Sequence, residues 1–189
     1  MKKVLILGSG GMLGHMVYDV LSEANCYEVH GTVSTVKIRE NDFILDVRNI
    51  QDVDVLIQEI KPAVIINCIG ILINGAKNNP ADAIFINSYF PNKLVEFARR
   101  VESRIIHIST DCVFSGKKGN YSELDLRDAE DTYGRSKSLG ELSNEYDVTL
   151  RTSIIGPEIG ENPKGLFDWF FNQKERINGY SRAYWGGVT

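Results

Sequence analysis

An apolar run, Lys3–Leu7, passes directly into a glycine-rich segment, Gly8–Gly14, and this junction constrains the fold most. Glycines at positions 8, 11 and 14 allow a tight turn from a strand into a helix and let a pyrophosphate approach the backbone. The first turn of that helix would offer free N–H groups to the anion. The pattern predicts a dinucleotide-binding unit, and a purely structural turn is the alternative. We expect the helix to bury Met12, Leu13, Met16, Val17, Val20 and Leu21.

Short apolar runs alternate with helical patterns as far as Arg151. Such alternation is typical of βαβ units, and nearly continuous apolar runs are typical of parallel strands that are buried on both faces. We therefore expect an α/β fold, a Rossmann-type doubly wound parallel sheet with helices on both faces, plus the start of a small C-terminal substrate region. The expected strands are Lys3–Leu7, Glu28–Thr32, Asp42–Leu45, Val64–Cys68, Arg104–Ile108 and Val148–Arg151.

Capping residues and prolines mark the ends of the expected helices. Asn79 followed by Pro80 predicts a helix start, and an earlier helix, Ile50–Ile60, should stop before Pro62. Thr132 is expected to cap a helix that begins at Tyr133, and Asn162 one that contains Leu166–Phe171. The apolar stripe expected after Asn79 consists of Ile84, Phe90, Leu94, Phe97, Ala98 and Val101.

The alternation stops after Arg151, and Gly156-Pro157 breaks the chain. We expect residues 1–155 to form an NAD(P)-binding Rossmann domain and residues 156–189 to begin a substrate-binding region, because this remainder is too short for a second core. No cap or helix closes the final Gly186–Thr189, so we expect the sequence to be cut short there. The aromatic cluster Trp169–Phe171 is expected to pack against the main domain.

Composition excludes several classes of protein. The net charge of -4 argues against a nucleic-acid partner, and no apolar run approaches the roughly 18 residues of a membrane span. The three cysteines, Cys26, Cys68 and Cys112, form no CxxC pair, so we expect no metal site and free thiols in a reducing compartment. These features predict a cytoplasmic protein with no membrane partner.

The end of the second strand should select the dinucleotide, because an acid there binds the ribose 2′-hydroxyl of NAD. This chain has Thr32 and Ser34, then Lys37 and Arg39, with no carboxylate from Gly31 to Arg39. Hydroxyls and cations suit a 2′-phosphate, which favours NADP(H) and leaves NAD(H) open. The alternative is that Lys37 and Arg39 are solvated loop charges.

Two further strand ends should meet the same cofactor, since ligands of open α/β sheets bind at the carboxyl ends of the strands. Asp46 and Val47 follow the third strand and should lie at the adenine ring. Cys68, Ile69 and Gly70 end the fourth strand and should line the ribose and pyrophosphate.

Tyr133 and Lys137 are four residues apart, so a helix would place them on one face. A neighbouring cation favours a phenolate, so the pair suits acid–base catalysis. Thr110 ends the fifth strand and should bind the same substrate oxygen. The alternative is an ordinary surface helix.

Taken together, these motifs resemble the extended short-chain dehydrogenase/reductases, and within them the dTDP-4-dehydrorhamnose reductase-like group. The resemblance covers essentially the whole nucleotide-binding domain and is highly specific for the superfamily. The stretches that carry it are Gly8–Gly14, Asn67–Gly70, Ser109–Gly116, Tyr133–Lys137 and Arg151–Ser153.

The resemblance implies a role for each matched residue. Tyr133 would be the general acid, Lys137 would lower the pKa of Tyr133 and bind the nicotinamide ribose, and Thr110 would polarise a ketone. Ser109, Tyr133 and Lys137 would also contact the cofactor. The pyrophosphate would be held by Gly8, Gly11, Met12, Leu13 and Gly14.

Two departures refine this interpretation. Dehydratases of the superfamily carry Thr-Asp-Glu where this chain has Thr110-Asp111-Cys112, which favours a plain reductase. The rhamnose enzymes resemble Arg-Thr-Ser-Trp where this chain has Ile154, so the sugar and its nucleotide stay open. His107 and Asn87 are expected to be a core residue and a structural support.

The resemblance implies an NADPH-dependent reductase of a nucleotide-linked 4-keto-6-deoxy sugar, in the supply of deoxysugars for surface polysaccharide. The partner would be the nucleotide-sugar substrate, and a homodimer is left open. The alternatives are a sugar-nucleotide epimerase of the same superfamily and a non-catalytic NADP-binding regulatory subunit.

Overall fold

The computed structural model describes residues 1–159, 163, 165–182 and 184–189. In these residues six strands form one sheet in the order β3-β2-β1-β4-β5-β6, and every neighbouring pair is parallel. The expected α/β fold is therefore confirmed, and each expected strand lies within one residue of an observed one. The strands are β1 (Lys2–Leu7), β2 (Tyr27–Val33), β3 (Asp42–Ile44), β4 (Val64–Asn67), β5 (Arg104–Ser109) and β6 (Val148–Arg151).

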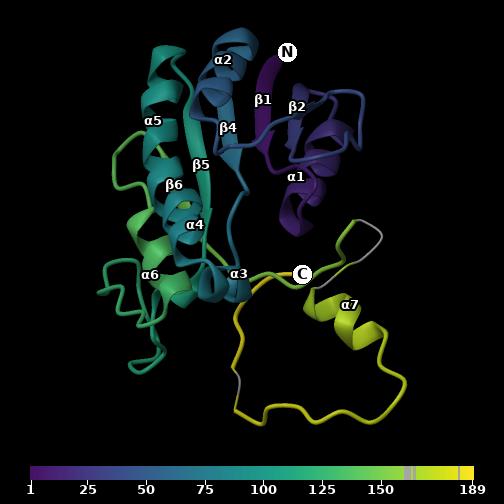
Figure 1. The fold of residues 1–189 in the computed structure, drawn as a ribbon, viewed down its shortest axis with the longest axis vertical. Helices are drawn as coiled ribbons and strands as arrows, with labels where there is room; N and C mark the ends of the chain where they lie inside the picture. The colour runs from purple at the N-terminus through teal and green to yellow at the C-terminus, as the bar shows by residue number, and fades with distance from the viewer. Residues whose placement is uncertain (160–162, 164, 183) are drawn as a thin grey trace.

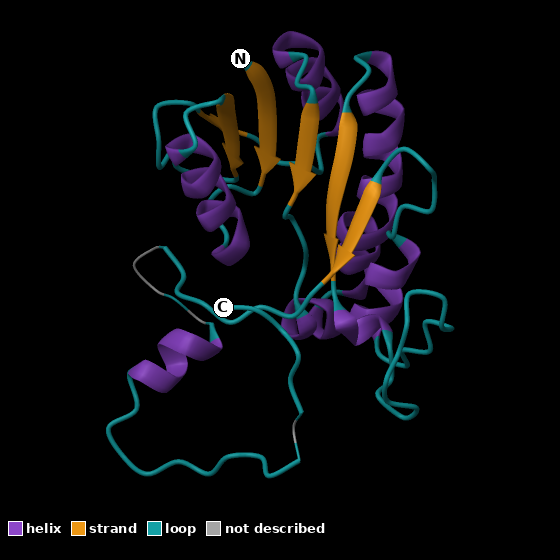
Figure 2. Cartoon of the chain, turned by 180° about the vertical axis from the view of Figure 1, so that it is seen from behind, coloured by secondary structure: helices purple, strands orange, loops and turns teal. Residues whose placement is uncertain are grey.

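The helices cover the two faces of the sheet unequally (Figures 1 and 2). On one face α2 and α5 pack on β1, β4 and β5 through a cluster that includes Leu5, Ile57, Ile65, Phe90 and Ile105. On the other face a smaller cluster joins α1 to β1, β2 and β4. The helices are α1 (Met12–Glu23), α2 (Ile50–Ile60), α3 (Ile73–Asn78), α4 (Pro80–Ile84), α5 (Phe90–Arg100), α6 (Thr132–Leu139) and α7 (Leu166–Phe171), with a π-helical turn at Phe85–Tyr89 and a 3₁₀ turn at Asp111–Val113.

The buried face of α1 differs from the prediction. Met16 and Val20 are 49% and 60% exposed, whereas His15 and Tyr18 are buried. The reason is the contact at Gly14, where an added Cβ would lie 2.0 Å from the carbonyl oxygen of Gly8. This contact turns the Gly14–Tyr18 side of the helix toward the sheet.

The chain from Asn79 to Arg100 is helical but not regular. Asn79 caps α4 as predicted, since its side chain accepts a hydrogen bond from the amide of Asp82. The π-helical turn then inserts extra backbone between α4 and α5 and changes the register of the buried face. Ile84 is consequently exposed, while Phe90 and Leu94 are buried as expected.

Other helix-end predictions have mixed outcomes. Asp131, rather than Thr132, caps α6, because its side chain accepts a hydrogen bond from the amide of Gly134 at 3.0 Å. The expected cap at Asn162 lies outside the described residues. Trp169 to Phe171 are 49–77% exposed, so their predicted packing against the main domain is wrong.

The segment that carries α7 lies beyond the carboxyl ends of the strands (Figure 1). The chain returns at Val188, which forms a parallel bridge with Ile154, and Trp185 donates a hydrogen bond to the hydroxyl of Ser153. None of the described helices combines the length and apolarity needed to cross a bilayer. Nor do the described residues group three or more His, Cys, Asp or Glu side chains as metal ligands.

Candidate functional site

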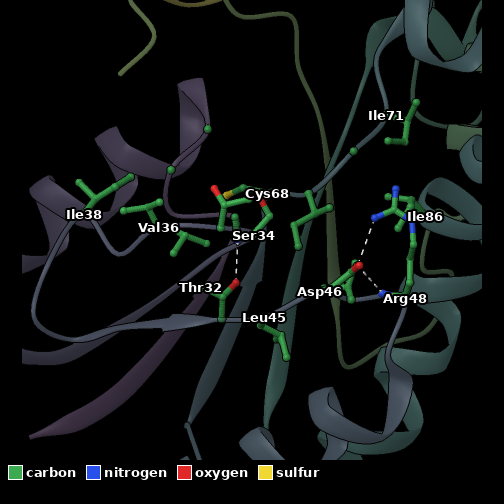
Figure 3. Close-up of a pocket in the computed structure, with 18 residues that line it drawn as sticks. Thr32, Ser34, Val36, Ile38, Leu45, Asp46, Arg48, Cys68, Ile71 and Ile86 are labelled. Carbon is green, nitrogen blue, oxygen red and sulfur yellow. Dashed lines mark hydrogen bonds and ion pairs between the residues drawn. The ribbon is translucent and has the colours of Figure 1, made fainter. Parts of the chain in front are cut away.

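A cavity of about 450 Å³ opens at the carboxyl ends of the central strands (Figure 3). This is the position where open α/β sheets bind ligands, and the volume falls in the range of small-molecule sites. The cavity brings together the ends of β1, β2, β3 and β4. Of the residues predicted to bind a cofactor, those that line it are Gly8, Gly11, Thr32, Ser34, Asp46, Val47, Cys68, Ile69 and Gly70.

The glycine loop forms one wall of the cavity and is held by its own backbone. The amide of Gly8 donates to the Thr32 hydroxyl at 3.1 Å, and the amide of Gly11 donates to the Gly8 carbonyl at 3.0 Å. No side chain of the described residues caps α1 at Gly11, so the amides of its first turn, at Met12 and Leu13, are available to an anion. This arrangement fits the pyrophosphate of a dinucleotide.

Arg39 and Lys37, the cations predicted to meet the cofactor after β2, contact other side chains of the protein. The Arg39 guanidinium lies 4.2 Å from the centre of the Tyr18 ring and donates to Asp19 at 2.7 Å. Lys37 lies 5.9 Å from the centre of the Phe43 ring. Neither residue lines the cavity.

Among the described residues the cation that lines the cavity is Arg48, which sequence reasoning missed. It donates to Asp46 at 3.1 Å and bidentately to Asp82 on α4 at 2.8 and 3.0 Å. Figure 3 shows Arg48 beside Ile86, across the cavity from Val36 and Ile38. Its position directly after Asp46-Val47 was the available signal.

The hydroxyls of Thr110 and Tyr133 meet at the carboxyl end of β5. The Thr110 hydroxyl donates to the Asp111 carboxylate at 3.2 Å and accepts from the amide of Cys112 at 3.1 Å, and it lies close enough to the Tyr133 phenol to lower the pKa of that phenol. Gly134 makes the approach of α6 feasible, because an added Cβ would lie 2.3 Å from the Cys112 carbonyl oxygen. The predicted pair of Thr110 and Tyr133 is thus brought together.

Lys137 is 4% exposed, and its ammonium donates to the Ile108 carbonyl at 2.7 Å. An added Cβ at Gly70 would lie 3.7 Å from Nζ, so the ammonium borders the cavity wall. Burial lowers the pKa of Lys137 to about 8, although the carboxylate of Glu141 opposes this.

Burial also raises the pKa of Tyr133 above its ordinary value, although the nearby Thr110 hydroxyl opposes this. Loss of solvent is the dominant influence on the phenol, while the Lys137 ammonium donates to the Ile108 carbonyl. That Lys137 lowers the pKa of Tyr133 stays a prediction.

Two buried networks hold this region in place. Asn87, in the π-helical turn, accepts from the amide of Ile71 at 2.8 Å and donates to the Ser136 hydroxyl at 3.0 Å. It therefore joins the cavity wall to the helix of Tyr133 and Lys137, in agreement with a supporting role. His107 is fully buried and accepts a hydrogen bond from Asn67.

The second network centres on Glu141. Its carboxylate accepts hydrogen bonds from Ser109, Arg127 and Arg151, all between 2.8 and 2.9 Å. Ser109, which is predicted to contact the cofactor, is 4% exposed, and its hydroxyl donates to Glu141 in this network.

Comparison with known proteins gives consistent matches. A sequence model described as the RmlD substrate binding domain matches residues 1–173. The dTDP-4-dehydrorhamnose reductase of Aggregatibacter actinomycetemcomitans is 35% identical over 169 residues, which are 86% of this chain and 54% of that protein. Methionine adenosyltransferase 2 subunit beta of Xenopus tropicalis is 30% identical over 182 residues, 94% of this chain and 54% of that protein.

A solved structure is also similar. The dTDP-4-dehydrorhamnose reductase of Bacillus anthracis, in complex with NADP, superposes with a TM-score of 0.72 at 29% identity, over 86% of this chain and 57% of that one. The chain spans about half the length of the curated relatives it matches.

Proposed function

Because this chain belongs to the family of the RmlD substrate binding domain, we propose that it acts as an NADPH-dependent reductase of a nucleotide-linked 4-keto-6-deoxy sugar. The observation that carries the proposal is the approach of the Thr110 and Tyr133 hydroxyls at the carboxyl end of β5, together with the Lys137 ammonium beside Gly70 in the cavity wall. A phenol, a hydroxyl and an ammonium beside a dinucleotide cavity suit proton transfer to a ketone.

The cavity fits a dinucleotide in two respects. The uncapped start of α1 suits a pyrophosphate, and the cavity lining from Thr32 to Ser34 offers hydroxyls with no carboxylate. NADP(H) is the proposed cofactor, supported by the NADP found in the Bacillus anthracis relative, and NAD(H) is the competitor in the test. A bound reduced nicotinamide supplies the hydride that the ketone carbon takes up.

The residues of this chain supply the rest of the chemistry. Tyr133 gives its phenolic proton to the ketone oxygen, and Thr110 holds the phenol in place. Lys137 binds the ribose next to the nicotinamide and adds positive charge at the oxygen that gains electron density. Residues 1–155 form the cofactor domain and residues 156–189 begin the sugar-binding region. The protein acts in the cytoplasm, where nucleotide sugars are made.

The test follows absorbance at 340 nm during NADPH oxidation with a panel of dTDP- and UDP-linked 4-keto-6-deoxy sugars. Wild type should consume NADPH with one of them, and Tyr133→Phe should lower kcat by about a hundredfold or more. Tyr146→Phe is the matched control, because Tyr146 is half-exposed and its hydroxyl donates to the Glu102 carbonyl, away from the cavity lining. Sugar conversion without net NADPH oxidation would instead show an epimerase.

A regulatory subunit is the second candidate, and the 30% identity to a methionine adenosyltransferase subunit favours it. Such a protein would bind NADPH but oxidise none with any sugar, and Tyr133→Phe would leave its function unchanged. A homodimer stays a prediction that light scattering of the purified protein tests.

A further inference from the structure

Asp42 opens β3 and is 1% exposed, yet its carboxylate is fully satisfied. One oxygen accepts from the Ser9 hydroxyl at 3.0 Å. The other accepts from the amides of Ile38 and Arg39 at 3.0 and 2.8 Å. Three donors from two separate segments therefore converge on the Asp42 carboxylate. A carboxylate that is removed from water needs such hydrogen bonds to replace its hydration. We call these residues, with Gly31, the Asp42 junction.

The two segments that meet at the Asp42 junction are neighbouring parts of the cavity lining. Ser9 lies between Gly8 and Gly10, which line the cavity, and Ile38 lines it from the loop after β2. The segments also touch directly, since an added Cβ at Gly10 would lie 3.0 Å from Cδ1 of Ile38. Asp42 itself does not line the cavity, so it acts on the lining through Ser9 and Ile38.

The neighbouring strand β2 has a glycine, Gly31, at the point where it passes the Asp42 junction. An added Cβ at Gly31 would lie 2.2 Å from Asp42 Oδ1 and 2.3 Å from the Ser9 hydroxyl oxygen. Any side chain at this position of β2 would push the acid and the glycine loop apart. Glycine at position 31 is thus matched to the hydrogen bond between Ser9 and Asp42.

Arg39 makes a second set of contacts between the loop after β2 and the glycine loop. Its guanidinium stacks on Tyr18 and donates to Asp19, both on α1, and it also donates to the Ser9 carbonyl at 3.4 Å. The loop after β2 is therefore attached both to the glycine loop and to the helix that follows it. Movement of one segment would alter the distance between the two parts of the lining.

We infer that Asp42 is a positioning residue for the dinucleotide, which sets the separation between the glycine loop and the loop of Ile38. Those two segments would contain the pyrophosphate and the adenosine ribose, by the general geometry of open α/β sheets. The inference rests on the proposed cofactor binding. Its distinct claim is that a buried acid outside the cavity controls affinity at the adenosine end.

The test is Asp42→Asn, which keeps the shape but replaces one acceptor oxygen with an NH₂ group. With the NH₂ toward Ser9, the Ser9 hydroxyl would accept from it and donate to the Thr32 carbonyl alone, so the charge-assisted hydrogen bonds of the junction become neutral and weaker. The dissociation constants of NADPH and of adenosine 2′,5′-bisphosphate, measured by fluorescence and calorimetry, should both rise about tenfold or more. The shorter probe isolates the adenosine end.

Asp147→Asn is the matched control. Asp147 is also buried, accepts from a backbone amide, that of Ile105, at 2.8 Å, and pairs with Arg99. It precedes β6 and so lies at the amino ends of the strands, opposite the cavity. At a temperature where circular dichroism shows both variants folded, its affinity for both probes should stay within about twofold of wild type.

Three results would overturn the inference. Asp42→Asn could bind both probes as wild type does, or both aspartate variants could lose affinity equally, which would show a general effect on stability. If Asp42→Asn does not fold, Ser9→Ala removes one donor and should weaken both probes by about threefold or more, and unchanged affinity would refute the inference. A wild-type protein that binds no dinucleotide refutes the proposed function itself, and it is measured first.

Discussion

Lys137→Met should make the protein more stable at neutral pH. Burial holds the pKa of this lysine at about 8, against an ordinary 10.5, and this difference corresponds to about 3 kcal/mol of unfavourable free energy for the buried ammonium. The methionine loses the hydrogen bond to the Ile108 carbonyl, worth about 1–2 kcal/mol. The net expectation is a gain of about 1–2 kcal/mol in the free energy of unfolding, or a few degrees in Tm.

The lowered pKa of Lys137 also determines how the stability difference between Lys137→Met and wild type depends on pH. The folded pKa of Lys137 is depressed, so the folded protein binds fewer protons than the unfolded chain between about pH 8 and 10.5. Wild type therefore recovers stability as the pH rises through this window. The advantage of Lys137→Met should be full below pH 8, should fall by about 3 kcal/mol across this window, and should become a deficit of about 1–2 kcal/mol near pH 10.5, where the variant lacks the hydrogen bond to the Ile108 carbonyl.

Urea denaturation of both proteins at pH 7, 8, 9 and 10 checks this. The quantity compared is the difference in the free energy of unfolding between the two proteins, because all their other titratable groups are the same. Lys77→Met, at an exposed position of α3, serves as the control and should show no such pH-dependent difference. A variant less stable than wild type at pH 7, or an advantage that does not change up to pH 10, would refute the reasoning.

Three further perturbations have defined outcomes. Glu141→Gln should lower the free energy of unfolding at pH 7 by about 3 kcal/mol, measured in urea. Burial opposes ionisation of Glu141, but hydrogen bonds from Arg151, Arg127 and Ser109 outweigh it and hold its pKa below the ordinary value; the variant's deficit should therefore vanish as the pH falls through that depressed pKa. Gly134→Ala should lower Tm and NADPH turnover together, because its methyl would meet the Cys112 carbonyl, and unchanged turnover would contradict the role given to this contact. With a thiol reagent at pH 8, exposed Cys26 should react first and Cys68, whose pKa burial raises to about 12, only on unfolding.

The fold was predictable because its signals are local. Each strand is a short apolar run, and the Gly8–Gly14 turn, the Asn79 cap and the stop before Pro62 are all set by neighbouring residues. Where the prediction failed, the local signals were ambiguous or a distant contact decided the outcome. Asp131 and Thr132 are both good caps, and the structure uses Asp131, whose side chain accepts a hydrogen bond from the amide of Gly134. The exposure of Met16 depends on Gly14 packing against Gly8.

The candidate site likewise contains residues whose positions were predictable from the sequence and residues whose positions were not. Residues at strand ends, such as Thr32, Asp46 and Gly70, line the cavity as predicted, since a parallel sheet itself delivers them there. The contacts of long side chains in loops cannot be predicted from the topology of the sheet. From the sequence, the Arg39 side chain could reach either the cavity or α1. In the structure it stacks on Tyr18 and pairs with Asp19, both on α1. Asp42 carried no sequence signal, because its partners come from two segments that only the folded sheet brings together.

The pKa values of the reactive pair bear on the direction of the proposed reaction. The same burial raises the pKa of Tyr133 and lowers that of Lys137, so at neutral pH the phenol keeps its proton and the lysine is mostly still charged. A protonated phenol is ready to donate to an oxygen that gains electron density, whereas oxidation of an alcohol must begin with a phenolate that takes a proton. The environment that this chain builds around Tyr133 therefore supports ketone reduction over the reverse reaction. It predicts that alcohol oxidation, assayed with NADP⁺, will need a higher pH than NADPH oxidation, and equal pH profiles for the two directions would contradict this.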